Sequence, residues 1–479
     1  MRPGAALKRI VASVLLAGCA VGPNYKRPAV ATPASFRGQV GPAEAASLAD
    51  RAWWEILDDE TLRTLVDAAL AANYDLRVAS ARVAEARALA GVAGLQFLPA
   101  LQAQGQWTRS KASPYTGAPT EPISLYQAEV TLGWELDVWG RIRRSNQAAL
   151  ATYLASEEAR RGVMLSLVAD VATDYFQLRK LDRQLEIARR TTTALSETLD
   201  LFNRRFEAGA ASALETASAK ASLEATAASV PNLERQVVAQ ENQLALLLGR
   251  PPEAIGRGAA LDDQSLPLQV PAGLPSDLLQ RRPDVRQAEE NLIAANAAVG
   301  VAKADFFPTI SLTGLFGGVA PELANLLSQG KTWSFGGGLL TPVVQGRALS
   351  QQYRAAVARW DEARAQFEQT VTTAFGEVST ALVAYAKLAA VEEAQARSVA
   401  AYRDAVRLSN QRYLAGLSDY LEVLQAQQAQ LAAENSLAET RFSRLAEFIE
   451  LYKALGGGWK LTDRDWSRPA PAAGAQGVR

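Results

Sequence analysis

Histidine is absent from this 479-residue sequence, and cysteine occurs only once, at Cys19. These absences exclude a zinc site built from Cys or His ligands, a Ser-His-Asp triad and a Cys-His nucleophile. Methionine occurs only at Met1 and Met164, so a dedicated relay for soft metal ions is poorly supported as well. We therefore expect no metal site, no cofactor and no enzymatic activity of these classes.

The sequence also has no excess of positive or negative charge. Lys plus Arg and Asp plus Glu both number 50, and no basic cluster is interleaved with aromatic residues. A protein that binds nucleic acid usually carries such a basic patch or stripe. Nucleic acid is therefore not an expected partner.

The N-terminus has the features of a bacterial export signal. Arg2, Lys8 and Arg9 precede an apolar run over residues 10–18, which is too short to span a bilayer. The run ends at Cys19 in the string Leu-Ala-Gly-Cys, which resembles a lipobox, where cleavage before the cysteine frees its thiol and its amine for acyl chains. We predict a signal peptide at 1–18 and a covalent lipid on Cys19. The alternative is an ordinary signal peptide with an incidental cysteine.

The residues after the cysteine are poor in core-forming side chains. Between 20 and 50, four prolines are spread among Ala, Gly and Ser, a composition typical of an extended linker. We predict a lipidated tether over 19–59 and a C-terminal tail over 459–479. No secondary structure is expected in 20–50, nor in 469–479, which is similarly poor in core formers. Ala20 in place of Asp resembles the bacterial rule for sorting lipoproteins to the outer membrane.

The rest of the chain is an internal duplication with an offset of about 207 residues. The same landmarks recur in the same order in both halves, which predicts one structural unit used twice. We place the first repeat at 60–250, a connecting segment at 251–275 and the second repeat at 276–458. The aligned landmarks are 73–76 with 282–285, 97–99 with 306–308, 140–141 with 346–347, 205–209 with 412–416, and 248–249 with 455–456.

Six helical patterns are expected, at 60–95, 143–206, 212–248, 276–304, 346–411 and 417–455. The third and sixth show the three-four spacing of coiled-coil seams, and Pro231 should bend the third or shift its start. In each repeat two shorter helices placed end to end match one long helix of roughly 96 Å. These lengths predict a helical cylinder wall about 100 Å long.

Between the helices, the period of the pattern changes to two. Apolar and polar residues alternate in 101–108 and 127–138, and more weakly in 309–316 and 333–339, within predicted hairpins at 97–138 and 306–342. This alternation fits a transmembrane β-barrel with a watery lumen, or alternatively a soluble sheet with one solvated face. Four strands cannot close a barrel, because the smallest membrane barrels have about eight. Several subunits would have to share one barrel.

Together these motifs resemble the TolC and OprM family of outer-membrane factors, in the lipoprotein branch that serves resistance-nodulation-division efflux systems. The matching segments, in order and spacing, are 19–28, Trp53-Trp54, 282–285, 288–289, 307–308, 412–416 and 419–421. The resemblance implies a homotrimer of mixed α/β fold, with a coiled-coil helical barrel as periplasmic tunnel and a 12-stranded β-barrel to which each subunit gives four strands. It implies a passive duct in the cell outer membrane, anchored by lipid and spanning the bilayer.

The resemblance also implies partners. A periplasmic adaptor (membrane fusion) protein would open the duct, and an inner-membrane pump would supply small molecules such as drugs or other toxic compounds. Adaptor hairpins would dock on the turns between the long and last helices, at Gly209, Ala211, Ser212, Gly416, Leu417 and Ser418. The simpler interpretation of the glycines is a helix C-cap, and the two roles are compatible.

The resemblance places carboxylates near the constriction of the duct, at Glu215, Glu422 and Asp419. This sequence departs from the family pattern at two positions: Ser418 stands where some members have a gate arginine, and Gln425 replaces an acidic residue. Other candidates that could hold the closed state by an interlocking contact are Arg412 and Tyr413.

Two functions of other classes compete with the duct. A non-conducting coiled-coil scaffold lipoprotein of the envelope would explain the helices but not the alternating strands. A carboxylate-based hydrolase would need paired acids in a cleft, and neither repeat shows such a pair. The exported substrate cannot be inferred from the sequence.

Overall fold

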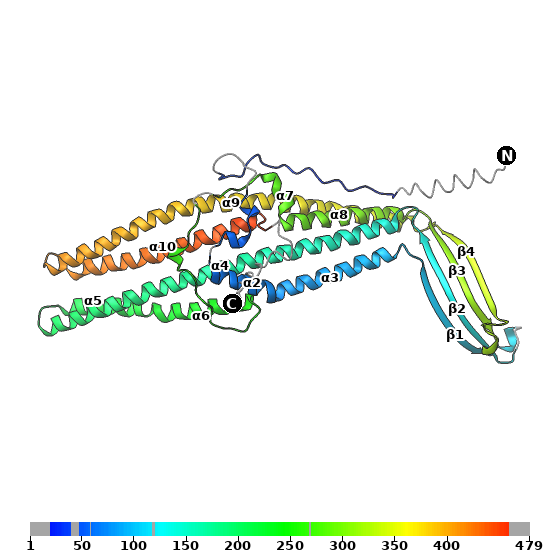
Figure 1. Cartoon of the computed structure of the whole chain (residues 1–479), viewed down its shortest axis with the longest axis horizontal. Helices are drawn as coiled ribbons and strands as arrows, with labels where there is room; N and C mark the ends of the chain where they lie inside the picture. Colours follow the sequence, from blue (N-terminus) through cyan, green and yellow to red (C-terminus); the bar gives the residue numbers. More distant parts are fainter. Residues whose placement is uncertain (1–19, 40–46, 58, 117–119, 268–269, 459–479) are drawn as a thin grey trace, which may run out of the picture. The chain divides into compact units, whose positions relative to one another are not determined.

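The computed structural model describes residues 20–39, 47–57, 59–116, 120–267 and 270–458. Each sequence repeat contains helices, a β-hairpin, a long helix and a returning helix (Figure 1). The helices are α2 (Glu60–Ala72), α3 (Tyr74–Leu95), α4 (Arg141–Glu207), α5 (Ala213–Ala227), α6 (Ser229–Leu247), α7 (Leu278–Arg281), α8 (Pro283–Ala304), α9 (Gly346–Leu414) and α10 (Tyr420–Ala454). The strands are β1 (Ala100–Ser110), β2 (Ile123–Leu136), β3 (Thr309–Ala320) and β4 (Lys331–Leu340).

The chain forms two compact units, and each contains parts of both repeats. The first unit holds the described residues up to 29 together with 82–157 and 287–368, and the second holds 30–81, 158–286 and 369 onward. The β-sheet lies in the first unit, and the turns that end α4 and α9 lie in the second.

The sheet of the first unit is antiparallel, in the order β1-β2-β3-β4, so the two repeats meet where β2 pairs with β3. In its register Leu101 lies opposite Leu132, and Trp107 lies opposite Tyr126 with ring centroids 6.4 Å apart. Because side chains alternate between faces, this register collects the apolar residues on one face. Within the described residues, β1 and β4 each have only one neighbouring strand.

The four predicted strands are present, but their predicted ends are partly wrong. The second strand begins at Ile123 and ends at Leu136, short of the predicted residue 138. Asp137 instead accepts hydrogen bonds from the amides of Ile142 (2.8 Å) and Arg143 (3.0 Å) at the first turn of α4. A side chain that caps a helix marks the start of that helix, so the strand has to stop before it.

Residues 20–29 have no regular secondary structure, as predicted, but specific contacts hold them against the first unit. The hydroxyl of Tyr25 donates to Glu289 (2.9 Å), and Arg27 forms an ion pair with the same carboxylate. The side-chain amide of Asn296 donates to the carbonyl of Pro23 (3.0 Å). An extended proline-rich segment leaves its backbone groups unpaired, and here part of them bind side chains of α8.

The prediction of no secondary structure in 20–50 is wrong at 48–50, which form a short 3-10 helix; a second one follows at 53–55. The side chains of Phe36, Leu48 and Trp53 are almost fully buried. Single large apolar side chains in a proline-rich stretch produce no periodic signal, which is why composition alone missed them. They join the core of the second unit.

That core surrounds two equivalent helix junctions. The side-chain amide of Asn73 donates to the carbonyl of Leu247 at the end of α6 (2.9 Å). In the second repeat the guanidinium of Arg282 donates to the carbonyl of Ala454 at the end of α10 (3.0 Å). Each side chain supplies a donor to one of the last carbonyls of a helix, which have no partner within the helix itself.

These junctions correct two predicted helices. The predicted helix at 60–95 is interrupted at Asn73, whose carboxamide oxygen caps α3 through the amide of Leu76 (3.0 Å). The predicted helix at 276–304 is interrupted at Arg282, because a residue before proline avoids the helical region. The end-to-end stacking is confirmed, since α6 meets α3 at one junction and α10 meets α8 at the other.

The helix lengths agree with this arrangement. The long helices α4 and α9 hold 67 and 69 residues. In the first repeat α2, α3, α5 and α6 hold 13, 22, 15 and 19 residues, about as many together as α4. The predicted effect of Pro231 is confirmed as well, because the third predicted helix is divided at Ala228 into α5 and α6.

The first junction leads to a prediction about stability. Asn73→Ala removes the cap of α3 and the donor to Leu247, so it should destabilise the second unit by about 1–2 kcal/mol. Thermal unfolding in detergent, followed by circular dichroism, measures the change. Asn203→Ala is the control, because Asn203 is exposed on α4. Equal unfolding temperatures for the two variants would show that the junction contributes nothing.

Candidate functional site: the hairpin turns

The site consists of two turns in the second unit, which we call the first tip (208–212, between α4 and α5) and the second tip (415–419, between α9 and α10). In the first tip Gly209 has φ of 70° and the amide of Ala210 donates to the carbonyl of Arg205 (2.7 Å). In the second tip Gly416 has φ of 74° and the amide of Leu417 donates to the carbonyl of Arg412 (2.9 Å). Both glycines therefore form the left-handed C-caps predicted from the sequence.

The tips leave space beside both glycines. Among the described residues, no atom lies within 4 Å of the position that a Cβ would take at Gly209 or Gly416. Leu417, Leu414 and Leu214 near the tips are 68%, 74% and 75% exposed. Exposed leucines next to glycines that expose their backbone form a small surface on which another helical turn could pack.

Glu215 has a local structural partner in the first tip. Its carboxylate accepts a hydrogen bond from the amide of Ser212 (2.7 Å), and the hydroxyl of Ser212 accepts one from the amide of Glu215 (3.2 Å). This reciprocal pair is a capping box that starts α5. The capping box says nothing about a constriction, so the position of Glu215 near the constriction of the duct stays a prediction.

The equivalent positions in the second tip interact differently. Glu422 forms an ion pair with Arg412 (3.2 Å), and both side chains are about half exposed. Asp419 is the N-cap residue of α10, but its side chain makes no capping hydrogen bond. The hydroxyl of Ser418 is buried and has no hydrogen-bond partner in the part of the chain that the structure describes. The second tip thus exposes the carboxylate of Asp419, whereas the hydroxyl of Ser418 is covered by its surroundings.

A hydrogen bond connects α4 and α9 just before the two tips. The guanidinium of Arg205, in the first repeat, donates to the hydroxyl of Tyr413 in the second repeat (2.9 Å) and lies 5.4 Å from the centre of its ring. Burial raises the pKa of Tyr413, and the positive charge of Arg205 partly opposes this rise. The phenol therefore stays protonated at neutral pH and accepts the hydrogen bond as a neutral group.

An aromatic cluster supports this hydrogen bond. Phe202 of α4 lies edge-on to Tyr420 of α10, with ring centroids 4.3 Å apart, and Tyr413 lies 5.5 Å from Tyr420. Burial raises the pKa of Tyr420 to about 12. Together with Leu195, Ala219, Val423 and Leu424, these rings form a small hydrophobic cluster between the two hairpins.

The structure thus brings Arg412, Tyr413, Asp419 and Glu422 together, and it adds Arg205, which the sequence analysis missed. The signal was present, because the duplication aligns Arg205 with Arg412. Cys19 lies outside the described residues, so its lipidation is untested. Among the described residues no group of three or more His, Cys, Asp or Glu side chains could hold a metal ion.

Comparison with known proteins assigns the family. The family model described as "Outer membrane efflux protein" matches residues 65–250 and 274–457, which is more than half of the chain. The chain therefore belongs to the outer membrane efflux protein family.

Individual relatives are similar to this chain over nearly its whole length. The "Probable efflux pump outer membrane protein TtgC" of Pseudomonas putida is 35% identical over 464 residues, which cover 95% of each chain. The solved outer-membrane channel OprN is similar with a TM-score of 0.86 and 32% identity, covering 92% of this chain and all of that one. The open state of the Neisseria gonorrhoeae outer-membrane channel MtrE is similar with a TM-score of 0.83 and 32% sequence identity. The match covers 92% of this chain and 99% of MtrE.

These findings confirm the predicted fold class, a duplicated set of long helices with a four-stranded membrane sheet. The chain is an efflux channel protein of the outer membrane, and this family is one of channels rather than enzymes.

The hydrogen bond between Arg205 and Tyr413 gives a prediction about spontaneous opening of the channel. Tyr413→Phe removes the acceptor for Arg205 and leaves the ring in place, so the channel should open more often in planar bilayers without any partner protein. Tyr402→Phe is the matched control, because Tyr402 is partly exposed on the same helix, α9. Equal open probabilities in wild type and Tyr413→Phe would exclude this hydrogen bond as a contribution to closure.

Proposed function

We propose that this protein is a passive, trimeric exit duct of a tripartite efflux system. A periplasmic adaptor opens it, and an inner-membrane pump supplies it with small toxic molecules. One observation carries the proposal. The chain has an amphipathic sheet whose two edge strands lack a second neighbour among the described residues, and it has helical hairpins that end in exposed tips. The name of TtgC, which refers to an efflux pump, supports the same assignment.

The sheet supports a trimer. Its apolar side chains are largely exposed within one chain: Leu101, Trp333 and Phe335 are 67%, 76% and 75% exposed. Backbone groups at an open sheet edge cannot remain unpaired inside a bilayer, so the strands need further copies to close a barrel. Three copies would give 12 strands, which is within the range of membrane barrels.

The tips support docking of an adaptor. The six predicted residues, Gly209, Ala211, Ser212, Gly416, Leu417 and Ser418, all lie in the two tips, next to exposed leucines. The exposed side chain of Asp419, which makes no capping hydrogen bond, could bind polar groups of an incoming helical turn. An inner-membrane pump of the resistance-nodulation-division class would act through this adaptor.

A lipid on Cys19 completes the proposal. Ala20, the next residue, packs against Gly140 at the start of α4, where a Cβ on the glycine would lie 2.6 Å from the Ala20 Cβ. Ala20 thus lies just beyond the end of β2. Acyl chains on Cys19 would anchor the protein to the membrane in addition to the sheet. Mass spectrometry of the mature N-terminus tests the modification, and an unmodified Cys19 would contradict it.

A non-conducting scaffold is the second candidate, but it is supported less. It would use the helices and leave the amphipathic sheet without a purpose. The solved MtrE structure is the open state of an outer-membrane channel, and this similarity also favours conduction over a purely structural role.

The carboxylates of the second tip give a prediction about ion selectivity. Three copies of Glu422 around one axis, together with Asp419, should favour cations and bind multivalent ones, as acidic rings do in other channels. Arg412 neutralises part of this charge, so we expect moderate cation selectivity and block by trivalent cations from the periplasmic side. Glu422→Gln should weaken both effects by about twofold or more.

Reversal potentials in asymmetric salt measure this selectivity. Glu197→Gln is the control, because Glu197 is exposed on α4 away from the tips. If Glu422→Gln changes neither selectivity nor block, Glu422 does not face the lumen and the constriction must lie elsewhere.

Docking on the tips gives a separate prediction. Gly416→Phe places a bulky ring on the second tip, so cross-linking to the adaptor and efflux should fall at least about tenfold while trimers still resist mild detergent. Gly416→Ala is the matched control: it carries the same unfavourable φ without the bulk. If both variants lose efflux and cross-linking equally, backbone strain at residue 416 is the cause. If efflux is normal in both, the tips only cap the helices and do not bind an adaptor.

A further inference from the structure

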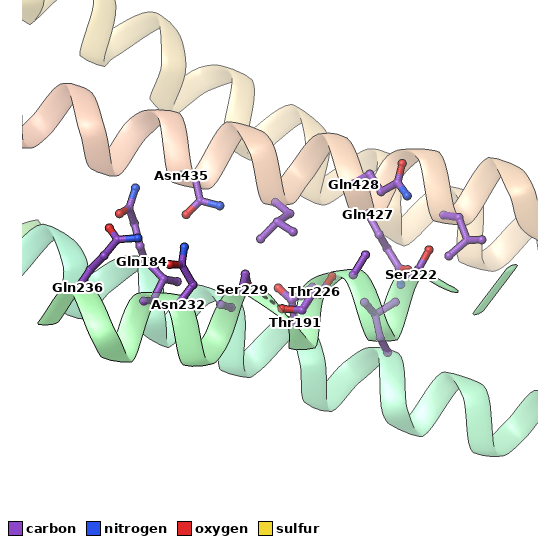
Figure 2. Close-up of a pocket in the computed structure, with 16 residues that line it drawn as sticks. Gln184, Thr191, Ser222, Thr226, Ser229, Asn232, Gln236, Gln427, Gln428 and Asn435 are labelled. Carbon is purple, nitrogen blue, oxygen red and sulfur yellow. Dashed lines mark hydrogen bonds between the residues drawn. The ribbon is translucent and has the colours of Figure 1, made fainter. Parts of the chain in front are cut away.

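A cavity of about 500 Å³ in the second unit is lined by α4, α5, α6 and α10. Figure 2 shows hydroxyl and amide side chains around it, among them Thr191, Asn232 and Gln427. None of its 16 lining residues is charged, so the cavity has no ionic group by which to select a ligand. The sheet of the first unit, in contrast, carries charged side chains at defined places.

The acidic side chains of the sheet belong to its polar face. Within β1–β4 the acidic residues are Glu129 and Glu135, both in β2. Glu129 lies opposite Gln104 of β1, whose side-chain amide donates a hydrogen bond to its carboxylate. Glu135 shares this face, because side chains alternate along a strand, and it pairs with Arg141 (2.8 Å). Both carboxylates thus have partners within the chain.

The basic side chains of the sheet belong to its apolar face. Within β1–β4 the basic residues are Arg109 and Lys331. Arg109 lies two positions after Trp107, and Lys331 lies two positions before Trp333, so each shares the face of an exposed tryptophan. Both cations are exposed, and neither forms an ion pair within the described residues. The face that contacts lipid in a membrane barrel therefore carries positive charge only.

Both cations lie at the extracellular end of the sheet. Figure 1 shows α3, α4, α8 and α9 meeting the sheet at one end, with the hairpin turns at the other. The helices of this family form a periplasmic tunnel, so the turns face the outside of the cell. Arg109 is next to the last residue of β1, and Lys331 is the first residue of β4, so both adjoin these turns.

An aromatic belt marks the membrane surface at the same level. Trp107 stacks on Tyr126 of the neighbouring strand, with ring centroids 6.4 Å apart, and Trp333 is 76% exposed. Tryptophan and tyrosine collect where the hydrocarbon core meets the lipid headgroups. Arg109 and Lys331 follow these rings toward the extracellular side, which is the level of the headgroups.

Closure of the barrel would bring the two cations together. In the proposed trimer β1 of one copy pairs with β4 of the next, and antiparallel pairing places the end of β1 beside the start of β4. Residues opposite each other in such a pair are roughly 5 Å apart, and like charges at this distance destabilise the pair. An anion between them removes this repulsion. The guanidinium fork of Arg and the ammonium of Lys both suit a phosphate group.

We propose that each seam between two copies binds a phosphate group of lipopolysaccharide, the phosphorylated glycolipid of the outer leaflet. Arg109 of one copy and Lys331 of the next hold the phosphate, and the exposed rings of Trp333 and Phe335 contact the acyl chains. The site rests on the proposed trimer, because one chain supplies only half of each seam. It adds a lipid partner that neither the tips nor the anchor requires.

Acidic residues of the turns are the competing partners for these cations. The turns that follow β1 and β3 contain one acidic residue each, Glu121 and Glu322. Glu322 already accepts a hydrogen bond from Asn325 (3.0 Å). If these carboxylates neutralised the seam instead, the trimer would have no preference for a phosphorylated lipid.

Native mass spectrometry of the intact trimer, titrated with purified lipid A in detergent, tests the site. The trimer should bind up to three molecules, at least about tenfold more tightly than lipid A from which the phosphates have been removed. The double variant Arg109→Gln, Lys331→Gln should bind both forms equally. The exchanged pair Arg109→Lys, Lys331→Arg keeps both charges and should keep the preference. Lys220→Gln is the control, because Lys220 is exposed on α5 in the second unit.

Three results would overturn the site: equal affinity of the wild type for the two forms of lipid A, an undiminished preference in the double variant, or equally tight binding of phosphatidylglycerol. A trimer that shows any of these leaves the proposed duct intact. A stable monomer would overturn the duct and the lipid site together, because no seam would exist.

Discussion

The requirement that strands β1 and β4 find partners governs the rest of this structure. Each has one neighbour among the described residues, and each presents a full row of backbone donors and acceptors on its other edge. In water such an edge is a liability, and in a bilayer every unpaired group costs several kcal/mol. A chain with four amphipathic strands can avoid this cost only by sharing a barrel with copies of itself. The symmetry of that barrel then applies to the helices of every copy, and it would bring equivalent tips together around one axis.

Within each chain, the two repeats share the same arrangement of helices and strands. The specific contacts arise where the sequences of the two repeats differ. The junctions at Asn73 and Arg282 use different side chains for the same purpose, which is to donate to the last carbonyls of a returning helix. At the tips the equivalent arginines have different partners: Arg205 reaches across to Tyr413, whereas Arg412 pairs with Glu422 of its own hairpin. The proline at 231 interrupts one returning helix and leaves the other continuous.

Much of this fold was predictable from the sequence, because long periodic patterns dominate it. The helical periods, the alternating strands and the effect of Pro231 were predicted from local rules that act over many residues. Features that depend on single side chains were missed. Burial of Phe36 and Trp53 within a proline-rich segment has no periodic signal, and the interruptions at Asn73 and Arg282 depend on contacts with helices far away in the sequence. The bond from Arg205 to Tyr413 was accessible only through the alignment of the repeats, which showed an arginine in each tip but not its partner.

The central claim is that three copies of this chain close one barrel and one duct. Native mass spectrometry of the protein released from detergent micelles measures the number of chains directly. A complex of three chains, which persists at concentrations where unspecific association disappears, is the expected result. A stable monomer, or a complex of any other number of chains, would contradict the account.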